Sequence, residues 1–306
     1  MSIFLNIGCL AIPRIAGFGD RDASSKTYGC FDRAYWHYKT IDYPNGRFQE
    51  AALSLALAST IVHENNRYHD SYLFKEWAKA AVSFWLKSNN KDGSSNESYP
   101  HEHHFCATAL SLRAISECLL LLNIPADEKI KKTGQFLIRH DNNRVANQVA
   151  GAAAALYNLF LLTAERCFKD GAEKKLKTLL SMQTDAGFFL EYGGFDLGYD
   201  TITLSLLASI YQKTKREDVA KAARRSIEHM KLFIDEEGYY FPETMSRRTQ
   251  FIYPFGIAVF DPALLKKIEN GLNANTILNP LWLDDRYCIP MTNDYLQCAA
   301  ELLHRQ

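Results

Sequence analysis

Apolar and polar residues along the chain form two kinds of helical pattern. The first is apolar on nearly every side, as in ANQVAGAAAALYNLFLL at residues 146–162. The second carries charges on one face: within residues 216–233, the apolar Val219, Ala223 and Ile227 recur at four-residue steps. A helix that is apolar all round is buried, whereas an amphipathic helix covers it. The pattern therefore predicts buried helices that are covered by amphipathic ones.

The two kinds of helix repeat at a regular interval. A turn containing Gly, Asn or Asp precedes each apolar stretch, with a step of about 50 residues. The turns are marked by Gly46, Gly93, Asn142, Gly187, Gly238 and Asp285. Repeats of this size also build open solenoids, but six units with small residues in the buried helices favour a closed ring. We predict an all-α fold, an (α/α)6 toroid with an inner and an outer ring of helices.

The N-terminal segment precedes the repeats and has a different pattern. MSIFLNIGCLAIPRIAGF is apolar, has no charged side chain before its apolar stretch, and is interrupted by Pro13 and Arg14. A membrane-spanning helix needs roughly 20 uninterrupted apolar residues. We therefore expect no membrane span and no leader, and a cytoplasmic location. Residues 1–25 are expected to form a strand or extended arm on a single toroid domain over 1–306.

Composition narrows the possible ligands. The 35 Lys and Arg residues balance 35 Asp and Glu residues, so the chain lacks the basic surplus that binding to nucleic acid or to an anionic membrane surface requires. The seven Cys residues have no CxxC spacing and are expected to be free thiols. We expect no metal and no cofactor. Many of the 16 Tyr residues lie in turns rather than in apolar runs, which draws attention to the loops.

In a closed toroid, the loops that enter the inner helices open at one end, so their polar residues converge on one cavity. Tyr, Asn, Arg, His and carboxylates together suit a carbohydrate, because rings stack on sugar faces while polar groups bind hydroxyls. We predict an oligo- or polysaccharide ligand, and the arginines favour an anionic one. The residues expected to bind it are Arg47, Tyr99, His101, Glu102, Asn147, Gln148, Tyr192, Asp200, Arg247, Arg248 and Asn293.

Several of these residues have a structural interpretation beside the functional one. The cluster at 101–104, His-Glu-His-His, lacks the HExxH spacing of a metal site. Its histidines either bind loop backbone, or at least one of them lies in the cavity as a general acid or base. In GGFDLGYD at 193–200, Asp196 or Asp200 caps the next helix, or Tyr199 and Asp200 face the cavity. The adjacent Arg247 and Arg248 are similarly either a solvated pair or a site for an anion.

Two segments carry a family resemblance. DGSSNESYPHEHHFCATALSLRAISECLLLL at 92–122 and TDAGFFLEYGGFDLGYDTITLSLLASIYQKTKREDVAKAARRSIEH at 184–229 resemble the helical toroid of the heparinase II/III and alginate lyase group. They are also similar to the helical domains of uronyl C5-epimerases and to uncharacterised toroids of surface-polysaccharide synthesis. The resemblance implies the same toroid fold and a carbohydrate-active protein.

The first functional hypothesis is abstraction of the C5 proton from a uronic acid in a glycan. This chemistry needs a group that neutralises the carboxylate, a base and an acid. Asn147, Gln148, Arg247 or Arg248 is expected to neutralise the carboxylate. The catalytic residues are His103 or His104 as the base and Tyr199 or Tyr253 as the acid. β-Elimination would make the protein a lyase, and reprotonation on the other face an epimerase.

Two alternatives stay open. A glycoside hydrolase would need two carboxylates about 5–10 Å apart, for which Glu102, Asp200 and Glu243 are the candidates. A non-catalytic glycan-binding or assembly protein of polysaccharide synthesis would hold a sugar without chemistry. The sequence leaves open whether the protein is an enzyme, and it favours a lyase or epimerase over a hydrolase.

Overall fold

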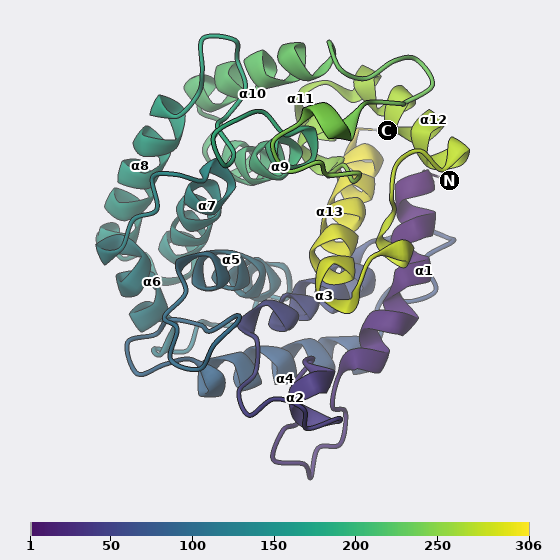
Figure 1. Ribbon diagram of the computed structural model, residues 1–306. Helices are drawn as coiled ribbons and strands as arrows, with labels where there is room; N and C mark the ends of the chain where they lie inside the picture. Colours follow the sequence, from purple (N-terminus) through teal and green to yellow (C-terminus); the bar gives the residue numbers. More distant parts are fainter. Residues whose placement is uncertain (1, 306) are drawn as a thin grey trace.

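A computed structural model describes residues 2–305, in which the regular elements are helices. Six helices form an inner ring in which each contacts the next and the last returns to the first (Figure 1). Their apolar pattern explains this position: every side chain of residues 51–59 is buried. The inner helices are α3 (Ala51–Thr60), α5 (Phe105–Leu121), α7 (Ala146–Thr163), α9 (Leu197–Thr214), α11 (Phe255–Phe260) and α13 (Asp285–His304).

An outer ring surrounds the inner one (Figure 1). Its helices bury one face only, as α10 does with Val219, Ala223 and Ile227. This arrangement confirms the predicted (α/α)6 toroid within residues 2–305. The outer helices are α1 (Ile3–Phe18), α4 (Tyr72–Ser88), α6 (Ile130–Arg139), α8 (Arg166–Ser181), α10 (Glu217–Met230) and α12 (Leu265–Ala274). Short elements between them are α2 (Arg33–Trp36), η1 (Gly46–Glu50), η2 (Pro242–Thr244), η3 (Pro262–Leu264) and η4 (Pro280–Trp282).

The prediction of an extended N-terminal segment is wrong, because residues 3–18 form helix α1. This helix packs against α13 and takes the outer position of the sixth pair (Figure 1). Gly8 allows the close approach, since a Cβ atom there would lie 2.7 Å from a methyl group of Leu296. Pro13 is accommodated inside the helix. The outer ring is therefore completed by a helix from the N-terminal end of the described chain, packed against the C-terminal helix.

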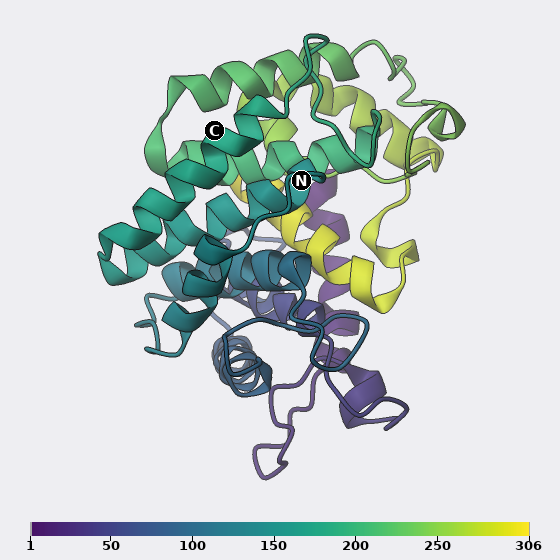
Figure 2. The same cartoon turned by 60° about the vertical axis from the view of Figure 1, so that its left-hand side comes forward.

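The loops that lead into the inner helices lie at one end of the ring. Figure 2 shows the segments before α11 and α13 on the right-hand side of the molecule. Isolated bridges tie such loops together, for example between Ser95 and His104 and between Val145 and Glu191. Among residues 2–305, no helix has both the length and the apolar character needed to cross a bilayer. Five of the seven cysteines are buried, and all seven are free thiols.

Candidate functional site

A cavity of about 340 Å³ lies at the end of the ring where the inner helices begin. Side chains from the entering loops and the first helical turns line its mouth. Its floor is formed about two to three turns further along α5, α9 and α13. The N-terminus of a helix carries a partial positive charge, so the converging helix starts favour an anionic ligand.

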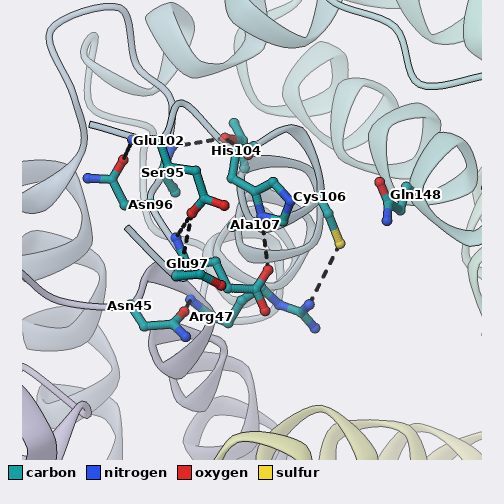
Figure 3. A network of polar contacts seen from close by, with 12 residues as sticks. Asn45, Arg47, Ser95, Asn96, Glu97, Glu102, His104, Cys106, Ala107 and Gln148 are labelled. Atoms are coloured by element: carbon teal, nitrogen blue, oxygen red, sulfur yellow. Dashed lines mark hydrogen bonds and ion pairs between the residues drawn. The ribbon is translucent and has the colours of Figure 1, made fainter. Parts of the chain in front are cut away.

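One side of the cavity is a network of charges from η1, α13 and the loop before α5. Arg47 forms an ion pair with Glu50 on η1. One carboxylate oxygen of Glu97 forms an ion pair with Arg286 of α13. The other oxygen lies 3.0 Å from His104 Nδ1. Figure 3 shows Arg47, Glu97 and His104 gathered in one polar network. We refer to Arg47, Glu50, Glu97, His104 and Arg286 as the ionic wall.

Glu97 places a negative charge beside His104. Burial by itself would raise the pKa of Glu97, but the contact with His104 and the charges of Arg47 and Arg286 outweigh it and lower the pKa to about 2. The two groups are close enough for an ion pair, but the buried His104 Nδ1 has no hydrogen bond of acceptable geometry. A carboxylate at this distance stabilises an imidazolium when the ring accepts a proton, which suits a general base.

Four residues predicted for the site lie on the same loop but outside the cavity lining: Tyr99, His101, Glu102 and His103. Glu102 instead folds the loop, because its carboxylate accepts the backbone N–H groups of residues 97 and 98 at 2.9 and 2.8 Å. His103 is exposed and lies 2.7 Å from the Asp92 carboxylate. Tyr99 and His101 are exposed to solvent. Of the 101–104 cluster, only His104 reaches the cavity.

A second part of the cavity lining is aromatic, and it adjoins the ionic wall where Arg286 lies 4.6 Å from the ring centre of Tyr287. The guanidinium of Arg247 lies 4.3 Å from the ring centre of Tyr192 and 5.8 Å from that of Tyr199. These two rings meet edge to face at 5.9 Å, and Tyr253 and Tyr287 line the cavity beside them. Within residues 2–305, Arg247 has no acidic partner. We refer to Tyr192, Tyr199, Arg247, Tyr253 and Tyr287 as the aromatic wall.

Burial sets the protonation of this wall. It raises the pKa of Tyr199 and of Tyr253 well above the ordinary value of a phenol. Both side chains are therefore protonated at neutral pH and available as hydrogen-bond donors. Tyr192 is about half exposed and presents its ring at the mouth, where a sugar face can stack on it.

Asn147 and Gln148 enter the cavity from the first turn of α7. The buried Glu191 holds Asn147 by accepting its backbone N–H and its side-chain Nδ2, each at 2.8 Å. Burial raises the pKa of Glu191 to about 8, although the hydrogen bonds from Asn147 oppose this shift. Gln148 accepts a hydrogen bond from Asn142 Nδ2 at 2.6 Å. The α7 contribution is thus fixed by the loops on either side of it.

Both interpretations of the 193–200 segment hold, each for a different residue. Asp196 caps α9 by accepting the N–H of Tyr199 at 3.1 Å. Tyr199 lines the cavity, but Asp200 does not. Asp200 is fully buried against the outer ring, where Ser226 of α10 donates a hydrogen bond to it at 2.6 Å. Asp200 therefore lies away from the cavity to which it was predicted to contribute, because successive helical side chains point about 100° apart.

The adjacent arginines also separate. Both side chains are exposed, but only Arg247 lines the cavity and Arg248 lies outside its lining. Arg248 has a left-handed backbone, with φ of 54°. Asp196 anchors this turn by accepting the N–H of Arg247 at 3.0 Å. The cavity lining also contains none of the carboxylates that were predicted for a hydrolase: Glu102, Asp200 and Glu243.

The floor contains a charge that the sequence interpretation missed. Arg113 lies on α5 and is 8% exposed. Its Nη2 atom donates to Ser209 of α9 at 2.7 Å and to Gln297 of α13 at 2.9 Å. The signal was present as an Arg inside a helix that is otherwise apolar all round. Asn293 and Asp294 of α13 also line this part of the cavity.

The structure thus brings together nine of the predicted site residues, from all six inner helices or the loops before them. They are Arg47, His104, Asn147, Gln148, Tyr192, Tyr199, Arg247, Tyr253 and Asn293. The lining also contains Glu97, Arg113, Arg286, Tyr287 and Asp294, to which the sequence assigned no binding or catalytic role. Among residues 2–305, no group of three or more His, Cys, Asp or Glu side chains is arranged to hold a metal ion.

The same architecture occurs in solved structures over nearly the whole chain. A polysaccharide lyase aligns with a TM-score of 0.57 at 12% identity, covering 99% of this chain and 98% of the other. A glycosyl hydrolase of family 88 from Bacteroides vulgatus aligns with a TM-score of 0.55 at 11% identity, covering 97% and 99%. A protein from Actinoplanes gives 0.52 at 13% identity, covering 98% and 100%. No family model and no curated protein sequence matches the chain. The likeness therefore establishes the fold.

Proposed function

We propose that this protein acts on a glycan containing uronic acid and that it abstracts the C5 proton of a uronate held in the cavity. One observation carries the proposal: Arg247, without an acidic partner, faces the same cavity as His104, which lies 3.0 Å from the carboxylate of Glu97. A cation that is free to bind a carboxylate and a base that is oriented beside it are what this chemistry needs.

The first step is recognition of the uronate. The guanidinium of Arg247 can bind both oxygens of a carboxylate, and its stacking on Tyr192 holds it at the mouth. Binding of the carboxylate withdraws charge from C5 and makes its proton more acidic. Asn147 is held rigidly by Glu191, so its free amide oxygen is positioned to accept a sugar hydroxyl.

The second step is proton transfer. His104 Nε2 accepts the C5 proton, and the imidazolium that forms is stabilised by Glu97. A protonated tyrosine of the aromatic wall, Tyr199 or Tyr253, then donates a proton. Donation to the leaving O4 atom breaks the C4–O4 bond and yields an unsaturated uronate. Donation to C5 from the other face yields the epimer.

The comparisons support the ligand class but do not choose the reaction, because a polysaccharide lyase and a glycosyl hydrolase share this fold. One specific observation supports hydrolysis as the second candidate reaction. Burial raises the pKa of Asp294 to about 7, and a general acid near neutral pH is what a hydrolase requires. A hydrolase would release reducing ends and form no unsaturated product, and Asp294→Asn should abolish that release.

The experiment incubates the protein with defined oligomers of glucuronate, galacturonate, mannuronate and guluronate. Ultraviolet absorbance detects the unsaturated product, and NMR in D2O detects deuterium at C5 of an epimer. We expect one of these signals, reduced about 10- to 100-fold in kcat/KM by Arg247→Ala. Arg248→Ala is the matched control and should leave the rate unchanged.

Three outcomes are informative. Equal effects of the two arginine variants would remove the assigned role of Arg247. Neither signal on any uronate oligomer would overturn the proposed chemistry. Binding of an oligomer that stays intact after long incubation would assign the cavity to a glycan-binding protein instead.

A further inference from the structure

The floor of the cavity contains a cation that no acidic side chain neutralises directly. Arg113 is 8% exposed, and the two side chains that accept its hydrogen bonds, Ser209 and Gln297, are neutral. Within residues 2–305, Arg113 forms no ion pair, and its buried Nε atom has no hydrogen-bond partner. The charges of Glu117 and Asp294 act on Arg113 only from beyond ion-pair distance. Arg113 is therefore a buried cation without a direct ion pair at the end of a polar cavity.

The carboxylates around Arg113 are committed to other groups. Glu117, one turn along α5, forms an ion pair with Lys213 of α9 at 2.9 Å and accepts a hydrogen bond from Asn158 of α7 at 3.0 Å. Asp294 accepts the backbone N–H of Phe255 at 2.8 Å. Burial also raises the pKa of Asp294 to about 7, so this carboxyl is only partly ionised at neutral pH.

The same side chains close the ring at this level. Through its Nη2 atom, Arg113 connects α5 to α9 and α13, which alternate around the inner ring. Behind it, Glu117 links α5 to α7 and α9. Polar cross-links thus fill the centre of the ring below the cavity. A sugar chain that enters from the mouth cannot pass through, so the floor receives the end of a chain.

We propose that Arg113, with Asn293 and Gln297, forms a deep anion subsite for the charged terminal residue of a glycan, so that the protein acts on chain ends. The two arginines then have separate tasks. Arg247 holds a carboxylate at the mouth, and Arg113 holds a second anionic group at the floor. This inference rests on the proposed function only in taking a uronate as the ligand, and it does not depend on the chemistry of His104.

The experiment compares a sugar acid with its neutral amide. Glucuronate and glucuronamide, and galacturonate and galacturonamide, are titrated calorimetrically into the full-length protein. One of the two acids is expected to bind more tightly than the other. Because the floor offers a charged hydrogen-bond partner, this acid should bind at least about tenfold more tightly than its own amide. Arg113→Gln should abolish this preference, because glutamine can keep a hydrogen bond to Ser209 but has no charge.

Two further variants keep the result interpretable. Arg113→Lys retains the charge and should retain most of the preference for the acid, which a purely structural role of Arg113 would not predict. Arg248→Gln removes a charge outside the cavity and should change nothing. If Arg113→Gln fails to fold, crystals of the unmutated protein soaked in the better acid should place a carboxylate within hydrogen-bond distance of Arg113.

The outcomes separate this inference from the proposed function. Loss of the preference in Arg247→Ala, with full preference in Arg113→Gln, overturns the floor subsite and leaves the proposed function standing. An Arg113-dependent preference without turnover of any oligomer supports the subsite and overturns the chemistry. No binding of either acid, or no carboxylate at Arg113 in the crystal, overturns the subsite.

The preference for chain ends has its own readout. If turnover occurs, a defined oligouronate should be shortened from one end, with the smallest product present from the earliest time point. Fragments of intermediate length at early times would show cleavage inside the chain and contradict a closed floor.

Discussion

The two walls of the cavity balance their charges in different ways. On the ionic wall, Arg47 and Arg286 each have a carboxylate partner, and Glu97 is shared between Arg286 and His104. On the aromatic wall, Arg247 lies against tyrosine rings and has no acidic partner within residues 2–305. Paired charges hold side chains in place, whereas an unpaired cation is available to a ligand. The comparison assigns orientation to the ionic wall and recognition to the aromatic wall.

The strongest test of this division concerns the one group of the ionic wall that is expected to react. His104→Gln removes the base while keeping a side chain that can hydrogen-bond to Glu97. We expect the rate of proton abstraction to fall about 100-fold or more, measured as deuterium exchange at C5 or as unsaturated product. His103→Gln is the matched control, because His103 is exposed and lies outside the cavity lining. Equal losses in both variants would show that the cluster acts through folding of the loop.

The next test breaks the ionic wall at its shared carboxylate. Glu97→Gln leaves Arg286 without its partner, and we expect the free energy of unfolding at pH 7 to fall by about 2 kcal/mol. Urea denaturation measures this loss, with the exposed Glu243→Gln as the control. The folded-state pKa of Glu97 is lowered to about 2, so its contribution is present above about pH 4.5 and is lost as the pH falls toward 2.

Glu97→Gln should therefore approach the stability of the unmutated protein at low pH. A difference that persists unchanged at pH 2 would show that the ion pair is not its cause. If the stability at pH 7 is also unchanged, the orienting role of the ionic wall is wrong.

The test with the smallest expected effect on activity concerns a carboxyl behind the aromatic wall. Burial raises the pKa of Asp200 to about 7, so ionisation of this group destabilises the fold as the pH rises from about 4 to above 7. Asp200→Asn keeps both hydrogen-bond connections, to Ser226 and to the Phe189 N–H, but cannot ionise. We expect the variant to be more stable than the unmutated protein at pH 8 by up to about 4 kcal/mol, at about 1.4 kcal/mol for each pKa unit, and equal to it near pH 4.

Thermal and urea unfolding across this pH range measure the effect, with the exposed Asp185→Asn as the control. The opposite pH trends of Glu97 and Asp200 sharpen the comparison between a paired and an unpaired carboxyl. A variant at Asp200 that loses stability at every pH would show that the native carboxyl is ionised and that its hydrogen bonds outweigh burial.

Part of the site was predictable because it follows from position in the repeat. Arg47, Asn147 and Tyr253 lie in the turns or first helical turns of their units, and the closed ring brings those turns together. The loop at 96–104 was not predictable in this way. Whether His103 or His104 faces the cavity depends on the hydrogen bonds that Glu102 and Asp92 make with the loop, and these contacts are particular to this fold.

The alternation of apolar and amphipathic helices by itself determined the ring, the number of units and the end at which the polar turns meet. Helical periodicity is a local property, so it can be read from neighbouring residues. Tertiary structure alone decided that residues 3–18 complete the outer ring as a helix. It also decided that Tyr199 faces the cavity while Asp200 faces the outer ring, and that Arg113 has no direct ion pair while Arg286 pairs with Glu97. Each depends on which distant segment packs against the residue, and the burial and charge of a side chain are set by those contacts.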